Sequence, residues 1–298
     1  MIVMRISIWP GAGQPYGDVL EAARHASETG WHGVWIADHF MPNDGTGADP
    51  LHPVLEAGSL VAAIGAVVPR VRIGTLVYGN TYRHPAVLAN MAATVDHVTR
   101  GRFTLGVGAG WQINEHEQYG IELSTIGKRI DRFVEALLVI KGLLRTPRTT
   151  VDGSYYQLKD AVCEPKPLQD PLPIMIGAKG EQRMLRVVAE HADMWNTWGR
   201  PDLIKHKSSV LDQHCADAGR NPADIVRTAQ ALTVVDGDIP PDLSMPVIGG
   251  SRKQLQKDLA AYQEAGVDEL IIPDGLLGTG AAKFRAMDTL RALVHADS

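Results

Sequence analysis

The sequence predicts a single (β/α)8 barrel, a fold class of the α/β type, from three observations. Eight short apolar runs with strand character alternate with segments of helical character along the 298 residues. The runs are continuous rather than alternating, as parallel strands buried on both faces require. Glycine and polar residues gather just after the strands, where such barrels carry their active sites. The expected strands are Arg5–Trp9, Gly33–Ala37, Arg72–Leu76, Phe103–Gly108, Pro173–Gly177, Asp193–Thr197, Arg227–Val235 and Glu269–Pro273.

The segments between these strands carry helix start and stop signals. Gly30 follows the first expected helix and suits a helix C terminus. Pro85 opens the helix after the third strand, where its missing N–H costs nothing. Ser251 is a suitable N-cap near the end of the chain. The named helices are Gly17–Glu28, Pro85–Val98, Ile126–Leu144, Glu181–Glu190, Pro201–Ala218, Ser251–Ala265 and Gly280–Val294.

The whole of residues 1–298 is expected to form one domain, because α/β barrels of this length are usually undivided. Two segments lie outside the repeat. Asp152-Gly153 between strand-like runs predicts a small hairpin. The segment Asp236–Gly250, rich in Pro and Gly, is expected to lie over the barrel mouth as a lid.

Composition excludes several classes of protein. No apolar stretch is long enough to span a membrane, and Met1–Trp9 lacks the regions of a signal peptide, so a cytoplasmic location is expected. A net charge of −5 offers no basic footprint for nucleic acid, which leaves a small-molecule substrate. Cys163 and Cys215 are too few for a disulfide framework. No metal-binding spacing, Walker loop or serine-nucleophile elbow occurs, so no metal site is expected.

The second strand ends in Asp38-His39, an acid and an imidazole where a barrel presents catalytic groups. Histidine titrates near neutral pH, so it suits general acid–base work. The alternative is that Asp38 caps a turn and His39 is an ordinary polar residue at the mouth. Position in the barrel leaves the two interpretations about evenly balanced.

Two further strand ends are rich in glycine. Gly74–Pro85 can hold a flat ring against exposed backbone, or it is a connection in which Gly79 and Asn80 supply turn geometry. The segment from Leu105 to Glu115 is not a dinucleotide motif, because Trp111 stands where G-x-G-x-x-G needs its third glycine. Its glycines let the backbone approach a ligand, and Trp111 is either a pocket wall or a packing residue.

After the fifth strand, Gly177-Ala178-Lys179-Gly180 leads into an expected helix whose N terminus favours an anion. Lys179 and Arg183 would add positive charge to such a phosphate site. An ordinary strand-to-helix turn is the alternative.

Together these motifs resemble the bacterial-luciferase-like superfamily, and within it the branch of deazaflavin (coenzyme F420)-dependent oxidoreductases. The resemblance covers most of the chain in the same order. Its segments are Val34–Phe40, Ile73–Ala89, Gly101–Trp111, His116–Ile121 and Pro173–Trp195.

The resemblance implies a flavin-type ring held at the strand C-terminal ends, with its phosphate near the fifth strand. It implies a cis peptide bond at Leu76–Val77, forming a bulge behind the ring. His39 matches the family's active-site histidine, and Asp38, beside it, would orient the imidazole or hydrogen-bond the ring. The positions matched to cofactor contacts are Thr75, Leu76, Val77, Asn80, Gly108, Ala109, Gly110, Asn114, Gly177, Ala178, Lys179 and Gly180.

The implied activity is hydride transfer between coenzyme F420 and a small organic substrate, with pocket walls from Trp9, Tyr78 and Trp111. Trp111 replaces the glutamate that serves as general acid in the related sugar-phosphate dehydrogenases, which argues against a sugar phosphate. Lys166, Lys179 and Arg183 are candidates to bind the anionic tail of the coenzyme. The family also implies a homodimer.

Three alternatives remain. An FMN-dependent monooxygenase using reduced FMN and O2 shares the barrel, the bulge and the phosphate turn. A non-catalytic flavin-binding protein would use the same site without turnover. A metal-dependent hydrolase is disfavoured by the missing ligand spacing.

Overall fold

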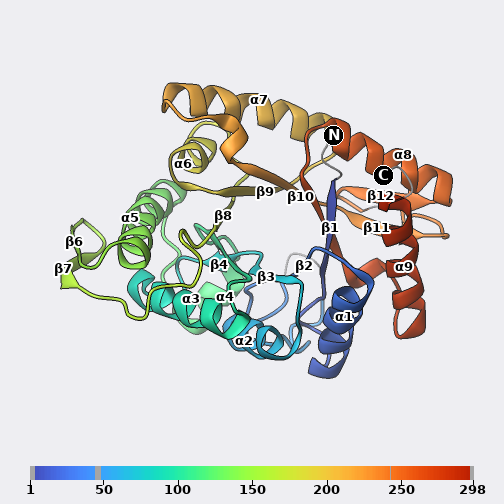
Figure 1. Cartoon of the computed structure of the whole chain (residues 1–298), viewed down its shortest axis with the longest axis horizontal. Helices are drawn as coiled ribbons and strands as arrows, with labels where there is room; N and C mark the ends of the chain where they lie inside the picture. The colour runs from blue at the N-terminus through green and yellow to red at the C-terminus, as the bar shows by residue number, and fades with distance from the viewer. Residues whose placement is uncertain (1–3, 44–47, 242, 296–298) are drawn as a thin grey trace.

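The computed structural model describes residues 4–43, 48–241 and 243–295. Eight parallel strands close into a barrel, because β3 pairs with β5 as well as with β2. This confirms the predicted fold class (Figure 1). The barrel strands are β1 (Arg5–Trp9), β2 (Gly33–Ile36), β3 (Arg72–Thr75), β5 (Phe103–Gly108), β8 (Ile174–Gly177), β9 (Met194–Trp198), β10 (Val226–Gln230) and β13 (Glu269–Pro273).

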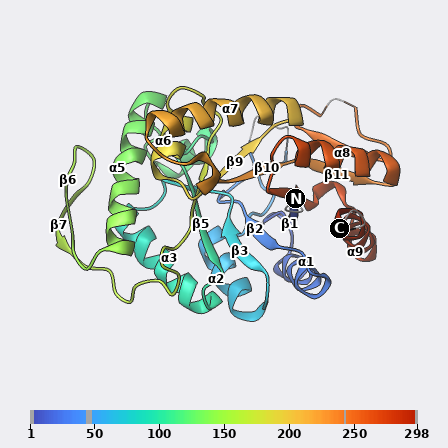
Figure 2. The ribbon, with the colours of Figure 1, turned by 45° about the horizontal axis from the view of Figure 1, so that its top comes forward.

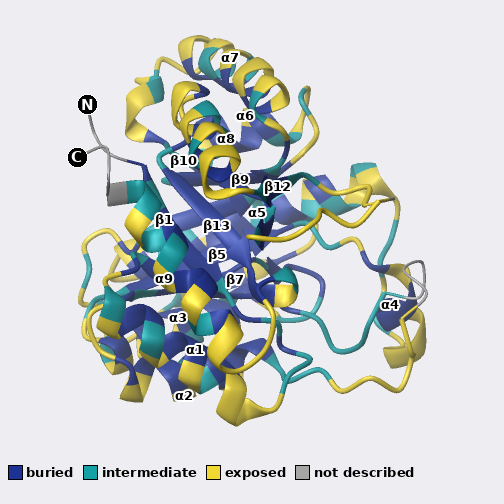
Figure 3. Cartoon of the chain, turned by 90° about the vertical axis from the view of Figure 1, so that its right-hand side faces the viewer, coloured by how far each residue is buried: buried dark blue, intermediate teal, exposed yellow. Residues whose placement is uncertain are grey.

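Helices surround the barrel, and their outer faces are exposed while the strands are buried (Figures 2 and 3). The short α4 (Ile113–Tyr119) follows β5 directly. The other helices are α1 (Tyr16–Thr29), α2 (Ala57–Val67), α3 (Pro85–Thr99), α5 (Ile126–Arg145), α6 (Met184–His191), α7 (Pro201–Asp217), α8 (Arg252–Glu264) and α9 (Ala281–His295).

The structure contains two helices, α2 and α4, that are not among the helices predicted from the sequence. In α2, exposed positions such as Ala63 and Val67 are as apolar as buried ones, so no amphipathic pattern marks the helix. The other, α4, is only 7 residues long. The start of α6 was also wrong: the helix begins at Met184, and residues 181–183 form turns.

The seventh expected strand, Arg227–Val235, is divided. Its second half, β11 (Leu232–Val235), pairs in parallel with β12 (Val247–Gly250) outside the barrel sheet. The segment expected as a lid therefore ends in a strand that contacts α8, and Asp242 within it lies outside the described residues. A closing motion of this segment stays a prediction. The hairpin is confirmed: β6 (Thr149–Asp152) and β7 (Gln157–Ala161) pair antiparallel.

A compact cluster of large side chains fills the barrel interior. Trp35 on β2, Met175 on β8 and Ile271 on β13 belong to one hydrophobic cluster, and all three are fully buried. Gly74 on β3 makes room for the indole, because a Cβ there would lie 2.1 Å from an atom of the Trp35 ring. The interior is therefore a packed core that supports whatever binds at its ends.

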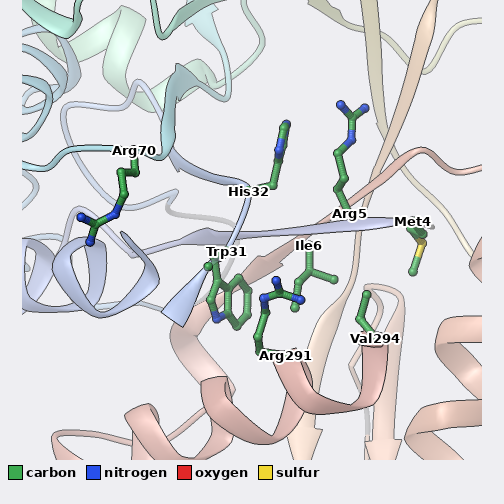
Figure 4. A pocket seen from close by; sticks show the side chains of 9 residues that line it. Met4, Arg5, Ile6, Trp31, His32, Arg70, Arg291 and Val294 are labelled. Atoms are coloured by element: carbon green, nitrogen blue, oxygen red, sulfur yellow. The ribbon is translucent and has the colours of Figure 1, made fainter. Parts of the chain in front are cut away.

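The N-terminal end of the barrel holds a cavity of about 270 Å³ (Figure 4). The side chains of Trp31, Ile6 and Arg291 lie beside one another there, while Arg70 points away from them. The cavity lies at the end opposite the expected active site, since its lining residues begin β1, precede β2 and β3, or lie near the end of α9.

Candidate active site

A bulge after β3 forms the floor of the site. The peptide bond Leu76–Val77 is cis, as the family resemblance implied, and it precedes the two-residue strand β4 (Tyr78–Gly79). Val77 packs against glycines of two neighbouring strands: a Cβ on Gly108 would lie 2.9 Å from Val77 Cγ2, and one on Gly177 would lie 3.0 Å from it. Glycine is therefore needed at both positions to leave room for the Val77 side chain, whether or not a ligand also binds there.

Thr75, just before the bulge, links β3 to β5 through its hydroxyl. Its Oγ1 donates to the carbonyl of Gly106 at 2.8 Å and accepts from the Gly106 N–H at 3.0 Å. A Cβ on Gly106 would lie 1.8 Å from the Thr75 carbonyl oxygen, so only glycine fits. The sequence analysis interpreted the glycines of this segment as residues that let the backbone approach a ligand. At Gly106 the structure gives a different reason for glycine, which is the close packing of β5 against β3.

His39 lies at the mouth, held by a carboxylate that the sequence analysis did not single out. Glu115 Oε1 lies within hydrogen-bonding distance of Nδ1 of His39, at 2.9 Å, and Oε2 accepts a hydrogen bond from the N–H of Phe40 at 2.9 Å. The hydroxyl of Tyr82 also donates to Oε1. The indole of Trp111 meets the imidazole edge-on, with ring centroids 5.4 Å apart. Glu115, and not Asp38, is the carboxylate within hydrogen-bonding distance of the imidazole.

Asp38 serves a different purpose. Its carboxylate forms a two-point ion pair with Arg83, at 2.7 and 3.0 Å, and accepts from the N–H of Gly79 at 3.0 Å. Arg83 also pairs with Glu56, and its guanidinium lies 4.7 Å from the centre of the Tyr78 ring. Asp38 therefore ties the end of β2 to the loop that follows the bulge.

The electrostatics of the two acids differ. Burial raises the pKa of the Asp38 carboxyl, and the hydrogen bonds from Arg83 and Gly79 oppose that shift. Burial also raises the pKa of Glu115, but the hydrogen bond and charge of His39, with the hydrogen bonds of Tyr82 and Phe40, outweigh it. The pKa of Glu115 therefore lies below its ordinary value, and the group is ionised at neutral pH.

Two buried amide side chains, Asn80 and Asn114, carry polar atoms without hydrogen-bond partners among the described residues. Asn80 is 2% exposed, and neither its side-chain oxygen nor its nitrogen has a hydrogen bond. Asn114 donates to the Pro42 carbonyl at 2.8 Å, which leaves its Oδ1 unpartnered and buried. Buried amides are normally hydrogen-bonded, so this arrangement fits a ligand whose edge carries both donors and acceptors. The pyrimidine edge of a flavin-type ring has that pattern.

The phosphate turn after β8 differs from the expectation. Because α6 begins at Met184, the helix N terminus lies beyond Gly180 and not directly after it. Lys179 is exposed, and its carbonyl accepts from Nζ of the buried Lys207 on α7 at 2.7 Å. Ala178 donates to the Asn196 carbonyl at 3.0 Å, which anchors the start of the turn to β9.

The candidates for the coenzyme tail fare differently. The prediction that Lys166 binds the coenzyme tail was wrong. Lys166 lies in the connection that leads into the N-terminal end of β8, and its ammonium donates to the carbonyls of Leu143 and Cys163 at 2.9 Å each. Arg183 is exposed and pairs with Asp131 at 2.6 Å. Lys179 and Arg183 remain on the active-site side.

The three residues expected to form the pocket walls, Trp9, Tyr78 and Trp111, differ in their exposure to solvent. Trp111 is 57% exposed beside His39. Trp9, at the end of β1, faces Trp198 at the end of β9, with centroids 6.0 Å apart, and sequence reasoning missed Trp198. Tyr78 is 2% exposed and packs beneath Arg83 in the core. A polar pair between β10 and β9 was also missed, in which Gln230, the last residue of β10, donates to Asn196 on β9.

Within the described part of the chain, no cluster of three or more metal-ligating side chains is arranged to hold an ion. None of the helices in the same residues is both long and apolar enough to cross a membrane.

Known proteins share both sequence and fold with this chain. An F420-dependent glucose-6-phosphate dehydrogenase of Microbacterium testaceum is 36% identical over 214 residues, which cover 70% of this chain and 61% of that protein. The corresponding enzyme of Amycolatopsis mediterranei is 35% identical over 176 residues, covering 59% of this chain and 50% of that one. The chain thus aligns with less than two thirds of either dehydrogenase.

Solved structures match the fold almost end to end. An F420-dependent secondary alcohol dehydrogenase in complex with an F420–acetone adduct superposes with a TM-score of 0.87 at 19% identity, covering 98% of this chain and 99% of that one. The F420-dependent tetrahydromethanopterin reductase of Methanopyrus kandleri gives 0.83 at 16% identity, covering 99% of each chain. A long-chain alkane monooxygenase also gives 0.83, at 15% identity, covering 99% of this chain and 91% of that one.

Residues 1–240 match the family described as luciferase-like monooxygenase. The cis bond at Leu76–Val77, the closed barrel and His39 at the end of β2 agree with that match. The chain is a member of the luciferase-like monooxygenase family.

Proposed function

We propose that the protein transfers a hydride between coenzyme F420 and a small organic substrate at the C-terminal end of the barrel. The observation that carries the proposal is a set of buried amide atoms without hydrogen-bond partners among the described residues: both polar atoms of the Asn80 side chain, which follows β4, and Oδ1 of Asn114. Relatives named as F420-dependent dehydrogenases support the choice of cofactor. When bound, a deazaflavin supplies a carbon centre that accepts or donates hydride and does not use oxygen.

The residues that would hold the coenzyme fall into three groups. Thr75, Leu76 and Val77 would support the ring from behind. Asn80 and Asn114 would hydrogen-bond its polar edge. Two glycine-rich turns would line the ring and take the phosphate; they consist of Gly108, Ala109 and Gly110, and of Gly177, Ala178, Lys179 and Gly180.

His39 is the proposed proton-transfer residue. Its Nδ1 is taken by Glu115, and Nε2 has no hydrogen bond to the described residues, so Nε2 is the nitrogen available to a substrate. Asp38 contributes by holding the loop after the bulge through Arg83. Trp9, Trp111 and Trp198 would form an apolar substrate wall, while Tyr78 supports Arg83 from the core.

The substrate we propose is neutral. Two cations near the strand C-terminal ends are already paired: Arg83 with Asp38, and Lys283 with Asp274 at 2.5 Å. An apolar wall with paired cations favours a neutral alcohol or ketone over a sugar phosphate, although relatives act on glucose 6-phosphate.

A fluorescence titration of the purified protein with F420 and, separately, with FMN tests the cofactor. Binding of F420 at least about tenfold tighter than FMN is the expected result, and Asn80→Ala should weaken it by about 1–3 kcal/mol because it removes partners of the ring edge. Gln213→Ala, at an exposed amide of α7, is the control. Preference for FMN would favour the monooxygenase alternative, and binding of neither would refute the site.

Turnover separates an enzyme from a flavin carrier. His39→Ala should keep F420 affinity and slow alcohol oxidation by about 10²-fold or more. A wild-type protein that binds F420 but oxidises none of a panel of neutral alcohols, and reduces none of the matching ketones or enones, would instead be a binding protein.

The proposed assembly is a homodimer formed through α2 and α3, which lie side by side. Their exposed residues include no charge, a composition typical of a covered surface. These residues are Ser59, Ala63, Ala66, Val67, Val87, Asn90, Thr94 and Val98. Val98→Glu should halve the mass measured by light scattering, and an unchanged mass would reject this face. We also propose a cytoplasmic location, consistent with two buried free cysteines, Cys163 and Cys215.

A further inference from the structure

We propose that Glu115 is a positioning residue that fixes the imidazole of His39 in one tautomer, with the proton on Nδ1 and Nε2 free for the substrate. The inference rests on the proposed hydride transfer for its kinetic consequence. Its structural part, the tautomer of His39, does not depend on any cofactor.

The contacts of Glu115 define its role. The side chain is completely buried, and His39 Nδ1 lies 2.9 Å from Oε1. The Tyr82 hydroxyl also donates to Oε1, and the Phe40 N–H donates to Oε2. An ionised carboxylate accepts and never donates. The proton must therefore reside on Nδ1 of a neutral His39, which leaves the lone pair on Nε2.

Among the described residues, His39 is the one basic side chain that contacts Glu115. Arg83 is taken by Asp38 and Glu56. The other nearby histidine, His116, uses Nε2 with Thr81 and Nδ1 with the Gln112 carbonyl, so both of its nitrogens are occupied.

This arrangement has a consequence for proton transfer. When an alcohol is oxidised, its hydroxyl proton would pass to Nε2 of His39, and a bound deazaflavin would supply the acceptor for the C–H hydride and its two electrons. His39 then carries a positive charge 2.9 Å from the Glu115 carboxylate, which stabilises it. For ketone reduction the same proton returns to the substrate oxygen.

The first test measures the tautomer directly in the wild-type protein without cofactor. Nitrogen-15 NMR of labelled histidine, with His39→Asn to assign the signal, is recorded at a pH high enough for the His39 imidazole to be neutral. The signal should show the proton on Nδ1. A neutral His39 protonated mainly at Nε2 would overturn the proposal, whatever the variants do.

The second test uses Glu115→Gln, with Glu117→Gln as control, because Glu117 is an exposed acid of the same helix. Glu115→Gln should shift His39 toward the Nε2-protonated form and lower kcat for alcohol oxidation by about 10²-fold, with F420 affinity changed less than about threefold. Glu117→Gln should match the wild type in all three measurements.

Two outcomes contradict the proposal. A Glu115→Gln protein with a wild-type tautomer and kcat would show that Glu115 does not position His39. A loss of thermal stability with kcat intact would show a purely structural role. Failure of F420 to bind the wild type would refute the proposed function, while the tautomer measurement would still decide the role of Glu115.

Discussion

Val77 and Gly108 meet across neighbouring strands so closely that a Cβ on Gly108 would lie 2.9 Å from Val77 Cγ2. The bulge that carries Val77 and the glycine-rich end of β5 are thus shaped by each other. Packing against Val77 therefore explains why glycine occupies position 108 without reference to any ligand.

Replacing Gly108 by alanine should displace the bulge. We expect Gly108→Ala to cost about 1–3 kcal/mol of unfolding free energy, as overpacking does, and to weaken F420 binding at least about tenfold. Urea denaturation and the fluorescence titration measure the two effects. Gly17→Ala is the control, since no atom lies within 4 Å of a Cβ built there. Wild-type affinity in Gly108→Ala would show that the bulge is not part of the cofactor site.

The buried ion pair between Arg83 and Asp38 gives a stability prediction. Arg83→Met should destabilise the fold by about 3–5 kcal/mol, because it leaves the Asp38 carboxylate buried without its partner. Adding Asp38→Asn should recover part of that loss. The exposed pair Arg148–Asp160 is the control, and Arg148→Met should cost less than about 1 kcal/mol. Equal losses in the two arginine variants by urea denaturation would contradict this assignment.

His32 makes the stability depend on pH. Burial lowers its pKa, with Arg5 and Arg72 acting in the same direction and Glu269 opposing them. The unfolded chain therefore binds a proton at a higher pH than the folded protein does, so stability falls as pH drops below about 6.5. We expect His32→Gln to reduce that slope in urea titrations between pH 5 and 7.5. The exposed His206→Gln should leave the slope as in the wild type, and a wild-type slope in His32→Gln would disprove the prediction.

Trp111 is expected to matter for substrate and not for folding. Because the side chain is 57% exposed, Trp111→Ala should change the unfolding free energy by no more than about 0.5 kcal/mol. With its indole beside His39, the same change should raise KM for a neutral aromatic alcohol at least about tenfold. Leu138→Ala, exposed on α5, controls for loss of surface apolar area. Unchanged steady-state kinetics would remove Trp111 from the substrate wall.

Much of the fold follows from local signals in the sequence. The strands Arg5–Trp9, Phe103–Gly108 and Glu269–Pro273 have the predicted bounds, because continuous apolar runs bordered by turn residues mark buried parallel strands. The cis bond at Leu76–Val77 was predicted through the family resemblance, since nothing in the local pattern requires it.

Errors arose where distant contacts decide the structure. The split of Arg227–Val235 depends on the pairing of β11 with β12, which the apolar run alone does not reveal. Lys166 was chosen by charge, but two backbone carbonyls hold its ammonium away from the site.

By itself, the sequence determined the barrel, the strand ends that carry polar residues and the place of His39. Only the tertiary structure decided which acid serves His39. Asp38 is its neighbour in sequence and pairs with Arg83, whereas Glu115, 76 residues away, holds the imidazole. The reason is geometric: successive residues leaving a strand point in different directions, while closure of the barrel brings the segment after β2 and the helix α4 after β5 together, so that His39 and Glu115 lie within hydrogen-bonding distance.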